Sequence, residues 1–235
     1  MLFNLLQADS LSALAGQAAA AAPVQQEMSF SFISMAAKGG WLMLVLLALS
    51  IVAIYLFGKK WWMIHKAGQI DKDFMNDIRD YLHEGKLKSA ITLSTKYDSP
   101  IARMVEKGLE RIGRPLGDIQ TAIENVGNIE VAKLGKGFTW LATTAAGAPM
   151  LGFLGTVTGM VKAFFAMANA GANANISVLA GGIYEALTTT VAGLVVGIIA
   201  LFAYNYLSAR VNHVMNQLEN KTMEFMDLLN EPASK

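Results

Sequence analysis

Three stretches of the chain are almost free of charged residues, and they predict membrane-spanning helices. Residues 39–58 and 137–161 hold no charge, and residues 163–209 hold one, Glu185. About 20 apolar residues of helix cross a bilayer core, and the polar tract at 169–175 divides the last stretch. The pattern predicts spans at 39–58, 138–167 and 176–207, the last two joined by a short loop at 168–175.

Aromatic and basic residues predict how these spans lie in the membrane. Trp41 and Trp61 are separated by about 30 Å of helix, which matches the thickness of the hydrocarbon core. Residues 59–137 contain 14 of the 19 Lys and Arg residues, whereas residues 1–40 contain only Lys38. Basic residues favour the cytoplasmic side. We therefore expect the 59–137 segment and the C-terminus in the cytoplasm, and the N-terminus and the short loop outside.

The segments between the spans are predicted to be helical. In residues 59–137, apolar residues recur at helical spacing, Ser99 followed by Pro100 is typical of a helix start, and residues 114–117 mark a break. After the break we expect one continuous helix over residues 118–167. The third span continues as a C-terminal helix over 208–235, whose apolar stripe we expect to pack as core.

The first 38 residues combine a leucine-rich start with an alanine-rich run. We expect an amphipathic segment at the outer membrane surface followed by a linker. A cleaved signal peptide is the alternative, although the basic start that such peptides carry is missing and Asp9 interrupts the apolar stretch.

Composition supports a membrane protein and argues against several other classes. Hydrophobic residues make up 54% of the chain and charged residues 16%, and the mean hydropathy is +0.39. The absence of cysteine excludes thiolate catalysis and cysteine-bound zinc. The net charge of +1 gives no reason to expect nucleic acid. The three histidines show no ligand spacing and no catalytic motif is present, so we expect no enzyme activity, metal or cofactor.

Glu185 is the charged residue that a membrane span is least expected to contain. It follows Ile176 by nine residues, or about 14 Å of helix, which predicts a position near the bilayer midplane. Such carboxylates normally face a bundle interior or a water-filled cavity. Thr156, counted from the end of the second span, has a similar predicted depth. Both residues are candidates for an ion pathway, and the alternative is that they only form structural hydrogen bonds.

Glycines predict a close approach of the second and third spans. Gly152, Gly155 and Gly159 share one face of the second span, and Gly193 and Gly197 have GxxxG spacing in the third. Such spacing lets helix backbones pack closely in lipid.

Two segments resemble the MotA/TolQ/ExbB proton-channel family. They are residues 148–160, with the sequence APMLGFLGTVTGM, and residues 182–190, with the sequence GIYEALTTT. The resemblance implies that Thr156, Glu185 and Thr190 line the pore and that Pro149 is the proline of the second span. Several relatives carry another proline where Ile199 stands here, which leaves the curvature of the third span open.

The resemblance implies an all-α, three-span, ring-forming subunit of a bacterial inner-membrane motor. Such a ring is typically a homopentamer that encloses helices of a small ExbD- or TolR-like partner, and no nucleic acid is involved. Three spans and an external extension are most similar to ExbB, which implies that the proton motive force energises TonB-dependent transport through a TonB-like protein. The alternatives are a TolQ-like or gliding-motility motor subunit, a membrane scaffold without ion flow, and an intramembrane enzyme, which a single carboxylate disfavours.

Overall fold

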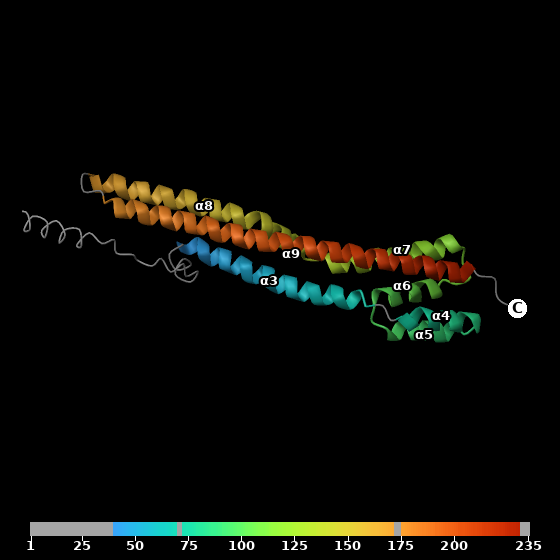
Figure 1. Ribbon diagram of the computed structural model, residues 1–235. Coiled ribbons are helices and arrows are strands. Elements are labelled where there is room, and N and C mark those ends of the chain that lie inside the picture. Colours follow the sequence, from blue (N-terminus) through green and yellow to red (C-terminus); the bar gives the residue numbers. More distant parts are fainter. Residues whose placement is uncertain (1–39, 70–71, 172–174, 231–235) are drawn as a thin grey trace, which may run out of the picture. The chain divides into compact units, whose positions relative to one another are not determined.

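The protein is an all-helical membrane protein in the computed structural model, which describes residues 40–69, 72–171 and 175–230. Within these ranges every regular element is a helix (Figure 1). In chain order they are α3 (Gly40–Ala67), α4 (Lys72–His83), α5 (Leu87–Lys96), α6 (Pro100–Leu109), α7 (Leu116–Gly135), α8 (Phe138–Ala170) and α9 (Ile176–Asn230). The segment predicted at 1–38 and residues 172–174 of the predicted loop lie outside the described residues.

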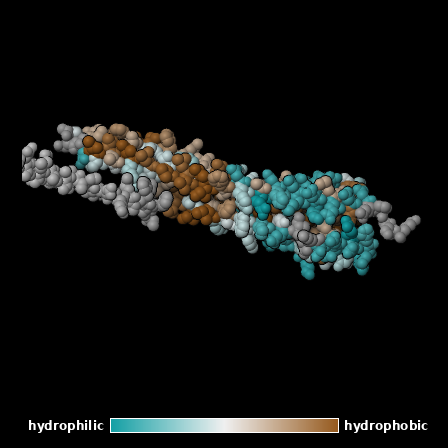
Figure 2. All heavy atoms as spheres, viewed as in Figure 1, coloured by the Kyte–Doolittle hydropathy of each residue, from teal (hydrophilic) through white to brown (hydrophobic). Residues whose placement is uncertain are grey.

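Three stretches of helix are long and apolar enough to cross a membrane: α3, the stretch that contains α8, and α9. Their outward-facing side chains are apolar, and Phe153, Phe165 and Phe202 are 66%, 69% and 71% exposed. Figure 2 shows hydrophobic residues gathered over α8 and the first part of α9, and hydrophilic residues over α4–α7. Exposed apolar surface on this scale is typical of membrane-spanning helices, and the three long apolar helices agree with the predicted three-span, all-helical architecture.

The third of these helices is far longer than a bilayer is thick. α9 runs unbroken for 55 residues, or about 82 Å. Its second half enters the helical domain, by which we mean α4–α7 together with the part of α9 that follows residue 207. There Val211, Val214, Leu218 and Phe225 are buried. The apolar stripe predicted for the C-terminal helix therefore packs as core.

The predicted continuous helix from 118 to 167 is wrong at one point. α7 ends at Gly135 and α8 begins at Phe138. Between them Gly137 has φ 94° and ψ −4°, a left-handed conformation that glycine adopts without steric cost. The helix is therefore interrupted just before the second span, which the apolar pattern alone did not indicate.

The predicted start at Ser99 and the predicted break at 114–117 are confirmed. The Ser99 side chain accepts a hydrogen bond from the backbone N–H of Ala102 at 3.3 Å, and Pro100 is the first residue of α6. α6 ends at Leu109, and α7 begins at Leu116 directly after Pro115.

The helical domain has an apolar core to which α6 and α9 both contribute. Phe74, Ile101, Leu109 and Phe225 are at most 2% exposed. A Cβ atom on Gly108 of α6 would lie only 2.6 Å from the Phe225 ring. Only a residue without a side chain fits there, so Gly108 allows α6 to lie directly against α9.

A network of ion pairs ties α6 to α7. The Arg103 guanidinium donates to Asp98 at 2.8 Å and to Glu130 at 2.7 Å, and Lys133 donates to Glu130 at 2.7 Å. Burial raises the pKa of Glu130, but the hydrogen bonds and charges of Arg103 and Lys133 outweigh it and hold the pKa below the usual range of a glutamate. Glu130 is therefore a paired carboxylate with a structural role.

Candidate functional site

The candidate site lies in the contact between α8 and α9, which run side by side along the part of the molecule that is hydrophobic (Figure 1). The residues of α8 that this contact buries recur every three or four positions, which is the spacing of one helix face. They are Leu141, Thr144, Ala148, Gly152, Gly155, Gly159 and Ala163. Most are small, so the two backbones approach closely.

Glycines form the closest part of this contact. A Cβ atom on Gly193 would lie 2.5 Å from the carbonyl oxygen of Ala148 and 2.9 Å from the Cα atom of Gly152. A Cβ atom on Gly159 would lie 2.9 Å from that of Ala186. Gly155 faces the Thr189 side chain. The structure thus places the three α8 glycines against α9.

Pro149 is part of the same contact. Proline has no N–H to donate to Ala145, four residues earlier in the helix. Gly197 of α9 packs over this position, where an added Cβ atom would lie 2.6 Å from the Pro149 ring and 3.1 Å from the Ala145 carbonyl oxygen. Of the residues singled out from the sequence for packing, all six lie in this interface.

Two threonines form a hydrogen-bonded link between the helices. The hydroxyl groups of Thr156 on α8 and Thr190 on α9 bond to each other. Both hydroxyl oxygens also lie within hydrogen-bond distance of the Gly152 carbonyl oxygen, Thr190 at 3.1 Å and Thr156 at 3.3 Å, so their two protons are shared among these three contacts. A lone threonine usually bonds its own helix, whereas here Thr190 bonds a carbonyl of the neighbouring helix. The link places three polar oxygens together between two spans.

Glu185 lies apart from this link. Its Oε1 atom would be 2.8 Å from a Cβ atom on Gly40, the first residue of α3, and the N-terminal end of a helix favours a negative charge. In the described part of the chain, no hydrogen bond or ion pair connects Glu185 to another residue. Glu185 is half-buried.

The structure places Glu185 beside the first residue of α3. Gly40 and Gly58 bound a charge-free part of α3 that is about 27 Å long, which is nearly the full hydrocarbon thickness. Glu185 lies beside Gly40, so it is level with the end of α3 that is farthest from the helical domain. Its predicted place near the bilayer midplane stays a prediction, because that depth depends on where the membrane lies along the spans.

Thr156 and Glu185 are also not at one level. Thr156 bonds Thr190, which follows Glu185 by five residues, or about 7.5 Å along α9. At about 100° per residue, these two α9 side chains point about 140° apart. One chain therefore does not bring Glu185 together with the threonine pair.

Thr189 is a further polar residue of this region. It is 2% exposed, and its hydroxyl donates to the Ala186 carbonyl at 2.8 Å. The glycine spacing on α8 gave a usable signal, since Gly155 leaves the space that the Thr189 side chain fills. No local signal pointed to Gly40, because its contact with Glu185 joins residues far apart in the sequence.

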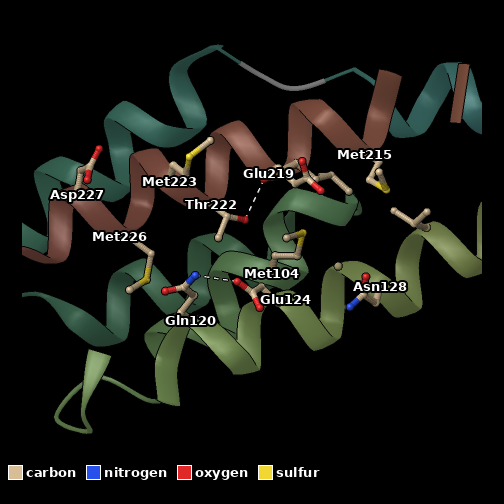
Figure 3. A pocket seen from close by; sticks show the side chains of 13 residues that line it. Met104, Gln120, Glu124, Asn128, Met215, Glu219, Thr222, Met223, Met226 and Asp227 are labelled. Carbon is tan, nitrogen blue, oxygen red and sulfur yellow. Dashed lines mark hydrogen bonds between the residues drawn. The ribbon is translucent and has the colours of Figure 1, made fainter. Parts of the chain in front are cut away.

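A hollow lies in the helical domain between α7 and α9 (Figure 3). It has a volume of about 610 Å³, and it is lined by methionines and by carboxylates. The methionines are Met104, Met215, Met223 and Met226, and the carboxylates are Glu124, Glu219 and Asp227. Its lining contains neither Glu185 nor the threonine pair, so it is separate from the candidate ion pathway.

Comparisons with known proteins find a family and several relatives that are similar to this chain. Residues 96–220 match the MotA/TolQ/ExbB proton channel family. An ExbB homolog of Methanothermobacter thermautotrophicus is 27% identical over 188 residues, which are 80% of this chain and 66% of that protein. The biopolymer transport protein ExbB of Neisseria meningitidis is 27% identical over 205 residues, 81% of this chain and 91% of the relative.

A relative named TolQ, rather than ExbB, is similar to this chain over a shorter region. The Tol-Pal system protein TolQ of Haemophilus influenzae is 40% identical over 106 residues, 45% of this chain and 46% of TolQ. The chain thus spans just under two thirds of the Methanothermobacter protein and less than half of TolQ. The family match over residues 96–220 contains α8, the threonine link and Glu185. Because this match covers more than half of the sequence, it shows that this chain belongs to the MotA/TolQ/ExbB proton channel family.

Proposed function

We propose that this chain is the ion-channel subunit of an inner-membrane motor that uses the proton motive force to energise TonB-dependent transport across an outer membrane. In this proposal several copies, typically five, form a ring around a small ExbD- or TolR-like partner. Glu185 takes up the ion. Thr156 of α8 and Thr190 of α9 line the ion path at a level closer to the helical domain.

The observation that carries the proposal is Glu185. It is the one charged residue among residues 163–209, and its carboxylate has no hydrogen-bond or ion-pair partner in the described part of the chain. A carboxylate in an apolar span is costly, and such residues commonly mark ion pathways. A structural role would instead leave its oxygens bonded to a neighbouring helix.

The separation of the polar groups supports a role for a second protein. Glu185 and the Thr156–Thr190 link are about 7.5 Å apart along α9 and face different sides of it. A proton that moves between them needs a carrier that neither helix supplies. A titratable residue on a partner helix in the centre of the ring would provide it.

The test replaces Glu185 in cells and measures energy-dependent uptake together with the yield of assembled complex. Glu185→Gln keeps the shape of the side chain but cannot ionise, so we expect normal assembly and uptake at background level. Glu185→Asp still titrates and should retain part of the activity. The matched control is Glu219→Gln, which removes a carboxylate from the same helix within the helical domain. Normal uptake by an assembled Glu185→Gln variant would favour the scaffold without ion flow.

A TolQ-like role in the cell envelope is the second candidate, because the chain is similar to proteins of both names. Mass spectrometry of the purified native complex separates the two roles by identifying the small partner. Vesicle assays decide the ion: we expect coupling to be abolished by a protonophore and to be independent of Na⁺. A requirement for Na⁺ together with resistance to the protonophore would refute the choice of H⁺.

A further inference from the structure

A basic pocket lies where α3 leaves its apolar stretch and meets the end of α7. Its six cationic residues are Lys59, Lys60, Lys66, Arg103, Lys133 and Lys136. The pocket has a volume of about 670 Å³, and apolar side chains such as Leu56, Met63 and Leu134 complete its walls. It is distant from Glu185, which lies beside the opposite end of α3.

Only part of this positive charge is neutralised by the protein. The lining contains two carboxylates, Asp98 and Glu130. Asp98 pairs with Lys66 at 3.2 Å and with Arg103 at 2.8 Å, and Glu130 pairs with Arg103 and Lys133, each at 2.7 Å. Among the described residues, the three other lysines pair with no carboxylate. They are Lys59, Lys60 and Lys136.

Lys60 holds the centre of the pocket. It is 7% exposed, and its ammonium group donates to the carbonyl oxygens of Leu134 at 3.2 Å and Lys133 at 3.4 Å. These carbonyls belong to the last turn of α7, where the helix leaves its acceptors unsatisfied. Burial lowers the pKa of the Lys60 ammonium group, and the charges of Lys59 and Lys136 lower it further. An added anion would therefore relieve the repulsion among three cations.

The pocket also lies at the level where lipid headgroups are expected. Lys59 and Lys60 directly follow the charge-free stretch of α3. Trp62, which lines the pocket, is 67% exposed, as is typical of a side chain at the membrane interface. The left-handed turn at Gly137 ends α7 there and leaves Lys136 exposed beside the pocket. Cations gathered at the mouth of a groove between spans attract anionic lipids.

From this geometry we infer that the basic pocket binds the phosphate group of an anionic phospholipid between Lys59 and Lys136, in front of Lys60. The acyl chains extend from it along the apolar side of α3 that carries Leu56. The other three cationic residues do not bind the lipid. They form ion pairs with Asp98 and Glu130 that stabilise the lining of the pocket, and they are Lys66, Arg103 and Lys133. The site is independent of ion conduction.

The test is native mass spectrometry of the full chain, released with its assembly from nanodiscs of equal phosphatidylglycerol and phosphatidylcholine. We expect the protein to retain phosphatidylglycerol preferentially. Lys59→Gln with Lys136→Gln should lower this preference by about thirtyfold, since each basic residue near the surface contributes about fivefold. Lys60 is left in place because it caps α7.

Two matched variants and one competitor make the result interpretable. Lys88→Gln with Lys96→Gln removes the same charge from α5 and should keep the preference, as should Lys59→Arg with Lys136→Arg. Equal retention of both lipids by the native protein would overturn the inference. So would complete displacement of the lipid by inorganic phosphate, which would indicate a site for free anions. Loss of a protein copy instead of lipid in the glutamine variant would assign these lysines to a contact between chains.

Discussion

Replacing Gly193 with alanine would place a methyl group against the backbone of α8. The added carbon would lie 2.5 Å from the Ala148 carbonyl oxygen, whereas ordinary contacts begin at 3.4 Å. The contacted atoms are backbone, so they cannot move aside as a flexible side chain does. The two helices must separate locally by about 0.9 Å or shift along each other.

Overpacking of this kind costs about 1–3 kcal/mol. At about 1.4 kcal/mol per factor of ten, the association of α8 with α9 should weaken by about fivefold to one hundredfold. Titration of the purified protein from mild detergent into SDS, followed by circular dichroism, measures the change as a lower SDS fraction at the midpoint of unfolding.

Gly147→Ala is the matched control, because this residue is also in α8 and an added Cβ atom there has nothing within 4 Å. Its midpoint should be unchanged or slightly raised, since alanine favours helix more than glycine does. A Gly193→Ala protein that unfolds at the same SDS fraction as the native protein would refute the close-packed contact between these helices.

Three further predictions concern the Thr156–Thr190 link, the ion pairs of Glu130 and the side of the membrane on which residues 59–137 lie. Thr190→Val removes the donor to the Gly152 carbonyl and should destabilise the α8–α9 pair by about 0.6 kcal/mol in the same titration, whereas Thr158→Val, whose hydroxyl bonds only its own helix, should change it less. Because its pKa is lowered in the folded protein, Glu130 contributes stability above about pH 4.3, and this stability is lost as the pH falls through the folded pKa. Acid unfolding of the helical domain should therefore depend less on pH in the Glu130→Gln variant than in the native protein. An unchanged pH profile would count against the Arg103–Glu130 ion pair. If the N-terminus lies outside, a cysteine at Ser10 should react with a membrane-impermeant thiol reagent in spheroplasts, and a cysteine at Ser89 should not. The reverse labelling would contradict the predicted orientation. Ser89 is chosen for the cytoplasmic segment because its side chain is exposed, whereas the nearby Ser94 is buried and would not be labelled on either side.

Local patterns predicted those parts of the fold that local forces determine. The three spans follow from the absence of charge, the start of α6 follows from Ser99 and Pro100, and the long α9 follows from an uninterrupted apolar stripe. Each of these signals acts within one helix, where spacing along the chain and position in space are directly related.

Contacts between distant residues were not predictable in this way. The end of α7 is fixed by Lys60, which is 74 residues away from Leu134 in the sequence. The position of Glu185 beside Gly40 depends on how α9 packs against α3, and no pattern within either helix contains that information. The break at Gly137 was missed because a glycine in a helical pattern is tolerated about as readily as it ends a helix.

The unbroken length of α9 makes it a lever arm. From Glu185 to Asn230 the helix extends about 68 Å, and it is buried at both ends, against α8 near Ala186 and within the helical domain near Phe225. A tilt of about 5° at the Glu185 end would displace the far end by about 6 Å over that length. A small movement where the carboxylate lies is thereby amplified into a displacement as large as one helical turn.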